Sequence, residues 1–266
     1  MFTSGVARSL RDASQAAETA TRLGSQLTTG RKIQTPDDDP STWLQAARSQ
    51  SAAGLLDVIH TGLSEAATDI GIADTTMQAI GKHLDTMTGS LTGALEYPSG
   101  NPARDQAISD YNTTLQQIDP MVSTTAQAGA RDLMSGGDLN VLTGLHGEQK
   151  TIHAQPVTAS ALNLSPLAAT ATDDEINAAL ANLTSAQATL SEKRQALATG
   201  GADINRYEAQ GTQLSDFYQN TVDSLTNADS TEAAVELQSV NVQRSLAMQT
   251  LAGISTMRQA VLELLN

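Results

Sequence analysis

The 266-residue chain contains no cysteine and very few aromatic residues. Without cysteine it can form neither a disulfide nor a thiolate metal site, and it has no cysteine nucleophile. One Trp, four Tyr and two Phe are too few to build a thick globular core, because aromatic side chains supply much of the buried area in such cores. Ala, Leu, Thr, Ser and Gln predominate, and this composition favours long helices that pack through Ala and Leu.

Basic residues are also scarce: 15 Lys and Arg stand against 29 Asp and Glu, which gives a formal net charge of −14. Such a chain lacks the basic stripe that neutralises nucleic-acid phosphates or anionic lipid headgroups. No stretch approaches the roughly 18 consecutive apolar residues of a transmembrane helix, and residues 1–8 lack the apolar run of a secretory signal. We therefore expect no nucleic-acid partner and no membrane partner, and export from the cell would need another route.

The strongest pattern lies between residues 56 and 94, where apolar side chains recur at alternating steps of three and four. This alternation averages 3.5 residues, so the stripe keeps facing a partner helix along a rod of about 60 Å. A break at residues 97–102 precedes a second helix, in which Pro120 is expected to cause a kink. The stripe residues of the first helix are Leu56, Ile59, Leu63, Ala66, Ile70, Ala73, Met77, Ile80, Leu84, Met87, Leu91 and Ala94.

The periodicity changes beyond Gly129. Residues 139–145 and 150–157 have the pattern of strands, and residues 146–148 have that of a turn, which together predict one β-hairpin. An isolated hairpin is marginally stable, so we expect it to lie against the helices.

A third long helix is predicted to start at Thr172, which forms a capping box with Glu175. Apolar residues then recur at every seventh position from Ile176 to Leu225. The pair Gly200-Gly201 is expected to interrupt this helix.

Apolar stripes also run along both terminal segments, which have no obvious internal core to cover them. They are predicted to pack between subunits. The alternative, an intramolecular bundle without partners, explains the stripes of the central helices but explains those of the terminal helices poorly. The residues assigned to polymerisation are Val6, Leu10, Leu23, Leu27, Leu237, Val240, Leu246, Leu251, Ile254, Val261 and Leu265.

The predicted fold class is therefore mainly α: a long coiled-coil-like helical bundle with one small β-hairpin and paired terminal helices. We expect five parts along the chain. They are an N-terminal helix at 1–35, a long helical hairpin at 36–128, a β-hairpin and loop region at 129–170, a third rod helix at 171–229 and a C-terminal helix at 230–266.

Residue clusters that could carry chemistry are better explained as structural. The acidic run 37–39 lacks the further ligands of a calcium loop, so a cap-and-turn role is favoured, with Pro40 at the first helical position. The four His residues are too scattered for a zinc site, and no G-x-S-x-G motif marks a nucleophile. We predict no catalytic residue, no metal site, no cofactor and no enzymatic activity.

Six short segments, taken in order, resemble those of bacterial flagellins. They are LTTGRKI at 27–33, DDDPSTW at 37–43, LQQID at 115–119, GARDL at 129–133, NAD with a following glutamate at 227–232, and QAVLELL at 259–265. The aromatic residue in DDDPSTW is typical of α-proteobacterial members. The family motif positions are Gly30, Arg31, Asp38, Asp39, Trp43, Ile118, Asp119, Gly129 and Asp229.

This resemblance implies a short flagellin without the variable outer domains. Such a protein is a structural subunit that self-assembles helically into the bacterial flagellar filament for swimming motility, with its terminal helices lining an inner tube. It is secreted through flagellar type III export and is extracellular. The implied partners are other copies of the chain, hook-associated and cap proteins, and a flagellar export chaperone.

Two other functions stay open at this point. The segment PDDDP at residues 36–40 resembles that of the hook–filament junction protein, a hook-associated member of the same family. A non-polymerising coiled-coil adaptor would carry similar stripes. Copy number along the flagellum distinguishes the junction protein, and polymerisation of the purified protein distinguishes the adaptor.

Overall fold

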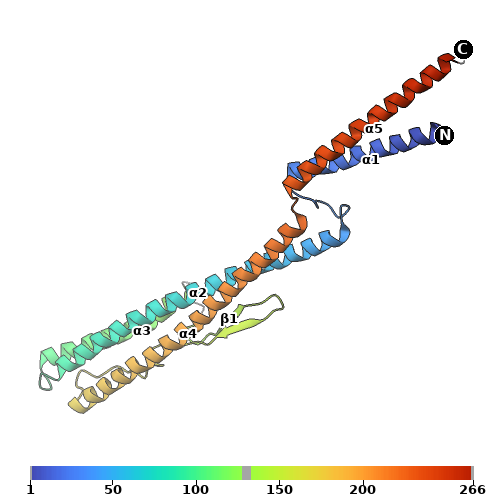
Figure 1. The fold of residues 1–266 in the computed structure, drawn as a ribbon. Coiled ribbons are helices and arrows are strands. Elements are labelled where there is room, and N and C mark those ends of the chain that lie inside the picture. The colour runs from blue at the N-terminus through green and yellow to red at the C-terminus, as the bar shows by residue number, and fades with distance from the viewer. Residues whose placement is uncertain (1, 128–132, 265–266) are drawn as a thin grey trace. The chain divides into compact units, whose positions relative to one another are not determined.

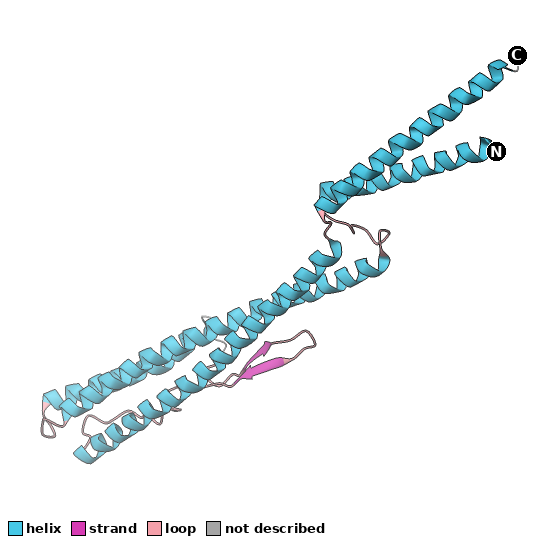
Figure 2. Cartoon of the chain, in the orientation of Figure 1, coloured by secondary structure: helices cyan, strands magenta, loops and turns pink. Residues whose placement is uncertain are grey.

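The computed structural model describes residues 2–127 and 133–264, with side chains over residues 5–126 and 133–257. It consists of long helices and one small hairpin (Figures 1 and 2). The elements in chain order are α1 Phe2–Thr29, α2 Pro40–Ala94, α3 Pro102–Gln127, β1 Leu139–Leu142, β2 Gln149–Ile152, α4 Asp173–Thr226 and α5 Ser230–Leu264. The predicted fold class is confirmed.

The chain folds into two compact units. Unit 1 comprises Met1–Ala53 and Asp216–Asn266, and unit 2 comprises Gly54–Ser215. Helices α2 and α4 each contribute to both units. None of the helices in the described part of the chain has the length and hydropathy that a membrane crossing requires.

The core of unit 2 is formed by the apolar stripe of α2. Every residue of the predicted series from Leu56 to Ala94 is at most 6% exposed. On α4 the seventh-residue series is buried from Ile176 to Ile204, and its later members Gly211, Tyr218 and Leu225 are half-buried. The 3.5-residue periodicity therefore located this core correctly.

Polar contacts fix the register of the helices in unit 2. The Thr76 and Thr125 hydroxyls lie 2.9 Å apart between α2 and α3. Between α2 and α4, the Arg194 Nε donates to Asp74 at 2.8 Å. The Gln187 amide donates to Asp85 at 2.7 Å. As positions rise along α2 they fall along α4, so these two helices are antiparallel.

Helix α4 runs without interruption through Gly200 and Gly201, so the expected break is wrong. A Cβ at Gly200 would lie 3.0 Å from Ile152 of β2, and a Cβ at Gly201 would lie 3.3 Å from Ile70 of α2. The glycine pair thus allows the hairpin and α2 to approach α4 closely on two sides. Helix α3 is one element that includes Pro120.

The predicted hairpin is confirmed, with shorter strands than expected. Strands β1 and β2 are antiparallel, and Leu139 pairs with Ile152. Both of these side chains are buried. The Lys150 ammonium lies 2.6 Å from Asp203 on α4, which attaches the hairpin to the helices.

Residues 153–171, termed here the strap, connect the hairpin to α4. Side chains of α3 hold the strap through its backbone groups, and these contacts recur at about two-turn intervals along the helix. The α3 residues are Arg104, Tyr111, Asn112 and Asp119, and their backbone partners are Ala171, Ser165, Leu167 and Ala159. The family motif residue Asp119 therefore fixes a turn of the strap inside unit 2.

Candidate functional site

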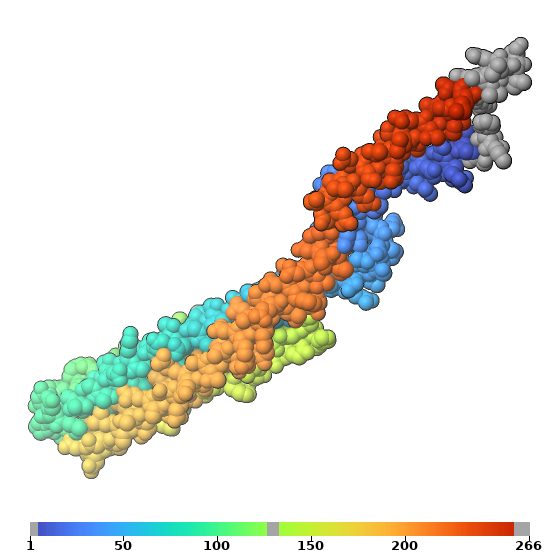
Figure 3. Space-filling view, in the orientation of Figure 1, coloured from blue at the N-terminus to red at the C-terminus, as the bar shows by residue number. Residues whose placement is uncertain are grey.

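The terminal helices α1 and α5 pack against each other in unit 1 (Figures 1 and 3). The end of α1 and the start of α5 meet, because the Ala228 amide donates to the Gly30 carbonyl at 2.9 Å, so the helices are antiparallel. The buried residues of this pair are Ala16, Leu23, Ala233 and Val240, and Ala20, Leu27 and Leu237 pack around them. Part of the predicted terminal stripe is thus covered within the chain.

The predicted polymerisation residues divide into distinct groups. Leu23, Leu27, Leu237 and Val240 belong to the α1–α5 contact. Val6, Leu10 and Leu246 are exposed. Leu251 and Ile254 are half-buried. The side chains of Val261 and Leu265 lie outside the described residues.

A second apolar stripe lies on the opposite face of α5, termed here the outer stripe. It consists of Val235, Val242, Leu246 and Met257, which are 55–65% exposed. Steps of seven, four and eleven residues bring these side chains to one face of a helix that turns about 100° per residue. Ala233 and Val240 face α1 from the other side. Of this stripe, the sequence-based prediction includes only Leu246, although the spacing of the other three residues is visible in the sequence.

The connection between α1 and α2 begins at Gly30, whose φ of 69° lies in the left-handed region that favours glycine. Its amide donates to the Gln26 carbonyl at 2.8 Å and ends α1. Arg31 then forms an antiparallel bridge with Asn227. The Lys32 amide donates to the Thr226 carbonyl at 2.7 Å. Two segments from opposite ends of the sequence are thereby joined beside the terminal helices.

Aspartates cap the helices that leave this junction. Asp39 accepts hydrogen bonds from the amides and hydroxyls of Ser41 and Thr42 at the start of α2. The Thr42 hydroxyl and amide, together with Ser41, lower the pKa of Asp39 to about 2. Asp229 accepts from the Thr231 and Glu232 amides and caps α5. Both aspartates satisfy amides that have no partner within their helix.

Asp38 organises the segment before α2. Its Oδ2 accepts hydrogen bonds from the Gln34 amide, the Thr35 amide and the Thr35 hydroxyl. The two backbone hydrogen bonds are the main reason why the pKa of Asp38 is lowered. Asp38 thus binds the residues before the turn, and its neighbour Asp39 binds the residues after it.

The family motif positions are only partly gathered in one place. Gly30, Arg31, Asp38, Asp39 and Asp229 meet at the junction of unit 1. Trp43, 37% exposed, lies in the first turn of α2. Ile118 is buried and Asp119 holds the strap, both in unit 2. Gly129 lies outside the described residues.

The helix cap formed by Asp39 can be tested at a pH where its carboxylate is charged. Because its folded-state pKa is depressed, its contribution is present above the ordinary value of 3.8 and is lost as the pH falls through about 2. We expect the Ser41 and Thr42 amides to exchange with solvent several times faster in D39A, measured by hydrogen exchange above pH 4. D37A is the matched control, and equal exchange in both variants would contradict the cap.

The described side chains include no group of three or more His, Asp or Glu that could hold a metal ion. Three of the histidines each lie beside a single carboxylate: His60 beside Glu208, His146 beside Glu148, and His153 beside Asp138. In unit 1, the described side chains form packing surfaces, helix caps and a paired junction.

The amino-acid sequence also matches a known protein family. The family model described as bacterial flagellin N-terminal helical region matches residues 5–137, which is half of the chain. The chain belongs to the bacterial flagellin family. Members of this family are structural proteins that self-assemble into the flagellar filament, and this flagellin is a structural subunit of the flagellum.

Similar flagellins span nearly the whole chain. Flagellin FljM of Caulobacter vibrioides is 22% identical to this flagellin, and the match covers 98% of this chain and 96% of the relative. Flagellin FljK of the same organism is 21% identical, covering 92% of this chain and 90% of the relative. The crystal structure of Bacillus cereus flagellin matches 57% of this chain and 88% of that one, with a TM-score of 0.50 and 16% identity, and shows the same fold.

Proposed function

We propose that this flagellin is a subunit of the filament shaft and polymerises through its paired terminal helices. In this proposal it is exported through the flagellar type III route, has no enzymatic activity, and acts outside the cell. Hook-associated and cap proteins would be its neighbours at the filament ends, and an export chaperone would bind it before assembly.

The outer stripe of α5 is the observation that carries this proposal. Four large apolar side chains stand exposed along one face of a helix whose other face is already covered by α1. Four large apolar side chains exposed along one helix face are more than the singly scattered apolar residues of an ordinary surface, and they indicate an interaction surface. In a family that forms homopolymers, the simplest occupant is the terminal helices of another copy.

The junction protein remains the second candidate. Its favouring observation is the segment at residues 36–40, in which Asp38 and Asp39 organise the turn before Pro40. Near full-length similarity to proteins named flagellin favours the shaft. Immunogold labelling of intact flagella distinguishes the two, because a shaft subunit is labelled along the whole length and a junction protein only at the base.

Truncation tests the role of the terminal helices. We expect deletion of residues 1–30 or of residues 232–266 to leave a soluble helical monomer that forms no filaments, because each deletion removes one partner of the α1–α5 pair. Electron microscopy under salting-out conditions, with circular dichroism of the monomer, measures both properties. Full-length protein is the control, and tubes formed by a doubly truncated chain would contradict the proposal.

A further inference from the structure

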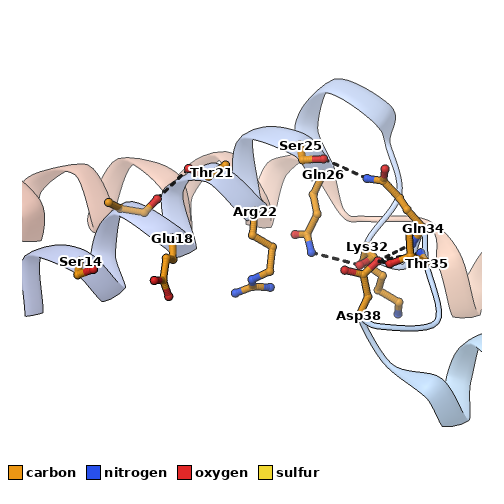
Figure 4. A pocket seen from close by; sticks show the side chains of 11 residues that line it. Ser14, Glu18, Thr21, Arg22, Ser25, Gln26, Lys32, Gln34, Thr35 and Asp38 are labelled. Carbon is orange, nitrogen blue, oxygen red and sulfur yellow. Dashed lines mark hydrogen bonds between the residues drawn. The ribbon is translucent and has the colours of Figure 1, made fainter. Parts of the chain in front are cut away.

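A polar groove lies beside the junction in unit 1 (Figure 4). It has a volume of about 630 Å³ and is bounded by residues 14–26 of α1 and residues 32–38 of the connecting segment. Arg22 projects from α1 into this space, one helical turn beyond Glu18. The groove opens to solvent and could accept a side chain from outside.

Most polar groups of the groove already have partners inside the chain. The Lys32 ammonium donates to the Ser224 carbonyl at 3.2 Å. The Gln34 side-chain Nε2 donates to the Thr29 hydroxyl at 2.8 Å. Asp38 accepts its three hydrogen bonds through Oδ2. Contacts within the chain therefore orient these groups, which form a polar wall.

Arg22 differs from its neighbours in the groove. Across residues 5–126 and 133–257, no carboxylate lies within ion-pair distance of its guanidinium, and no hydrogen bond from it is formed. Glu18 stands at the spacing that permits a helical ion pair, yet no such pair is present. A guanidinium offers five donors in a planar fork that matches a carboxylate. Its charge acts on Asp38 across the groove and adds to the Gln34 and Thr35 hydrogen bonds that lower the pKa of that carboxyl, but its guanidinium donors form no hydrogen bond among the described residues.

Carboxylates without partners occur on the other terminal helix. Glu232 and Glu236 are exposed, lie one turn apart on α5, and form no ion pair within the described part of the chain. They belong to the same unit as Arg22 and lie near the end of α5 that adjoins the groove. The terminal pair therefore carries a cation with free hydrogen-bond donors on one helix and carboxylates without ion-pair partners on the other, among the described residues.

This charge arrangement suits a contact between the groove of one copy and the α5 carboxylates of another. Residues 1–32 are basic in a chain whose net charge is −14. The basic residues there are Arg8, Arg11, Arg22, Arg31 and Lys32, against Asp12 and Glu18. Subunits with a large net negative charge repel one another, so the few basic positions determine where they can meet. A heterologous contact uses two different surfaces of each copy and can repeat along a filament.

We propose that Arg22 binds the carboxylates of Glu232 and Glu236 from α5 of a neighbouring copy. This inference rests on the proposed self-assembly and names one polar contact within it. The incoming carboxylate accepts hydrogen bonds from the guanidinium fork, and the polar wall of the groove limits the directions from which it can enter. Apolar packing along the outer stripe supplies adhesion, whereas this charged contact selects the register between copies.

Charge reversal and its repair test the contact. The critical concentration for polymerisation of the full chain is measured by sedimentation for R22E, for E232R/E236R, and for the triple variant. We expect each partial reversal to raise the critical concentration about tenfold or more, because like charges then face each other across the contact. The triple variant restores opposite charges and should return to within about threefold of the wild type.

Matched controls separate this contact from a general charge effect. R48E makes the same change at an exposed arginine on α2 and should polymerise as the wild type does. Circular dichroism checks that each monomer keeps its helices, and R22Q supplies a milder change if R22E does not fold. Wild-type polymerisation of R22E, or failure of the triple variant to recover, would overturn the contact. Absence of filaments in the wild type would overturn self-assembly itself.

Discussion

Replacing Leu246 by aspartate should abolish filament formation while leaving α1 and α5 paired. Leu246 is 57% exposed in the subunit and belongs to the outer stripe. In a filament this position would be covered, and a buried carboxylate without a partner costs several kcal/mol. A loss of about 3 kcal/mol corresponds to a critical concentration more than a hundredfold higher, because 1.4 kcal/mol is a factor of ten. Sedimentation and electron microscopy measure this outcome.

The matched control lies on the other face of the same helix. Val240 is 7% exposed and packs against α1, so V240D should separate the terminal helices already in the monomer. The monomer's helix content should fall in V240D and stay constant in L246D. If L246D polymerised at the wild-type concentration, the outer stripe would face solvent or the lumen in the filament. The role assigned to it would then be wrong.

Replacing Arg104 by alanine should strongly destabilise unit 2. The side chain is 2% exposed, and its guanidinium donates to the carbonyls of Tyr97 and Ala171 at 3.0 and 2.9 Å. It also lies 2.6 Å from the Asp173 carboxylate. Hydrogen bonds that involve a charged group each contribute about 1.5–3 kcal/mol, so we expect a loss of about 3–5 kcal/mol in the free energy of unfolding.

Denaturant unfolding of the full-length chain, followed by circular dichroism, measures this loss. The control is R194A, because the ion pair between Arg194 and Asp74 is partly exposed and such pairs contribute about 1 kcal/mol or less. Arg104 joins the turn between α2 and α3 to the start of α4, whereas Arg194 joins two helices that already share a core. An equal effect of the two substitutions would contradict the clamp that we assign to Arg104.

The apolar periodicity of the sequence predicted the long helices well, because a stripe of this length leaves only one face of the helix that can be buried. All members of the series from Leu56 to Ala94 lie in the core of unit 2. The hairpin was equally readable, since its strand and turn residues are contiguous. These features depend on neighbours that are close in sequence.

Features that depend on distant partners could not be predicted in the same way. Gly200 and Gly201 resemble a helix break, and only the approach of Ile152 and Ile70 shows that they make room for packing. Similarly, the sequence assigned one stripe to α5, whereas the helix has two. Which of these faces meets α1 is decided by contacts with Leu23, a residue at the far end of the chain.

Pairing of α1 with α5 also bears on the order in which the molecule folds. Leu23 and Val240 are separated by more than 200 residues, so an unfolded chain must close a very long loop to join them. Within unit 2, His60 and Glu208 lie 3.3 Å apart, so folding of that unit shortens the remaining loop to roughly 70 residues. The entropic cost of closure falls by about 1 kcal/mol as a result. In the proposed assembly, competence to polymerise is thereby favoured by the folding of a unit that carries none of the outer stripe.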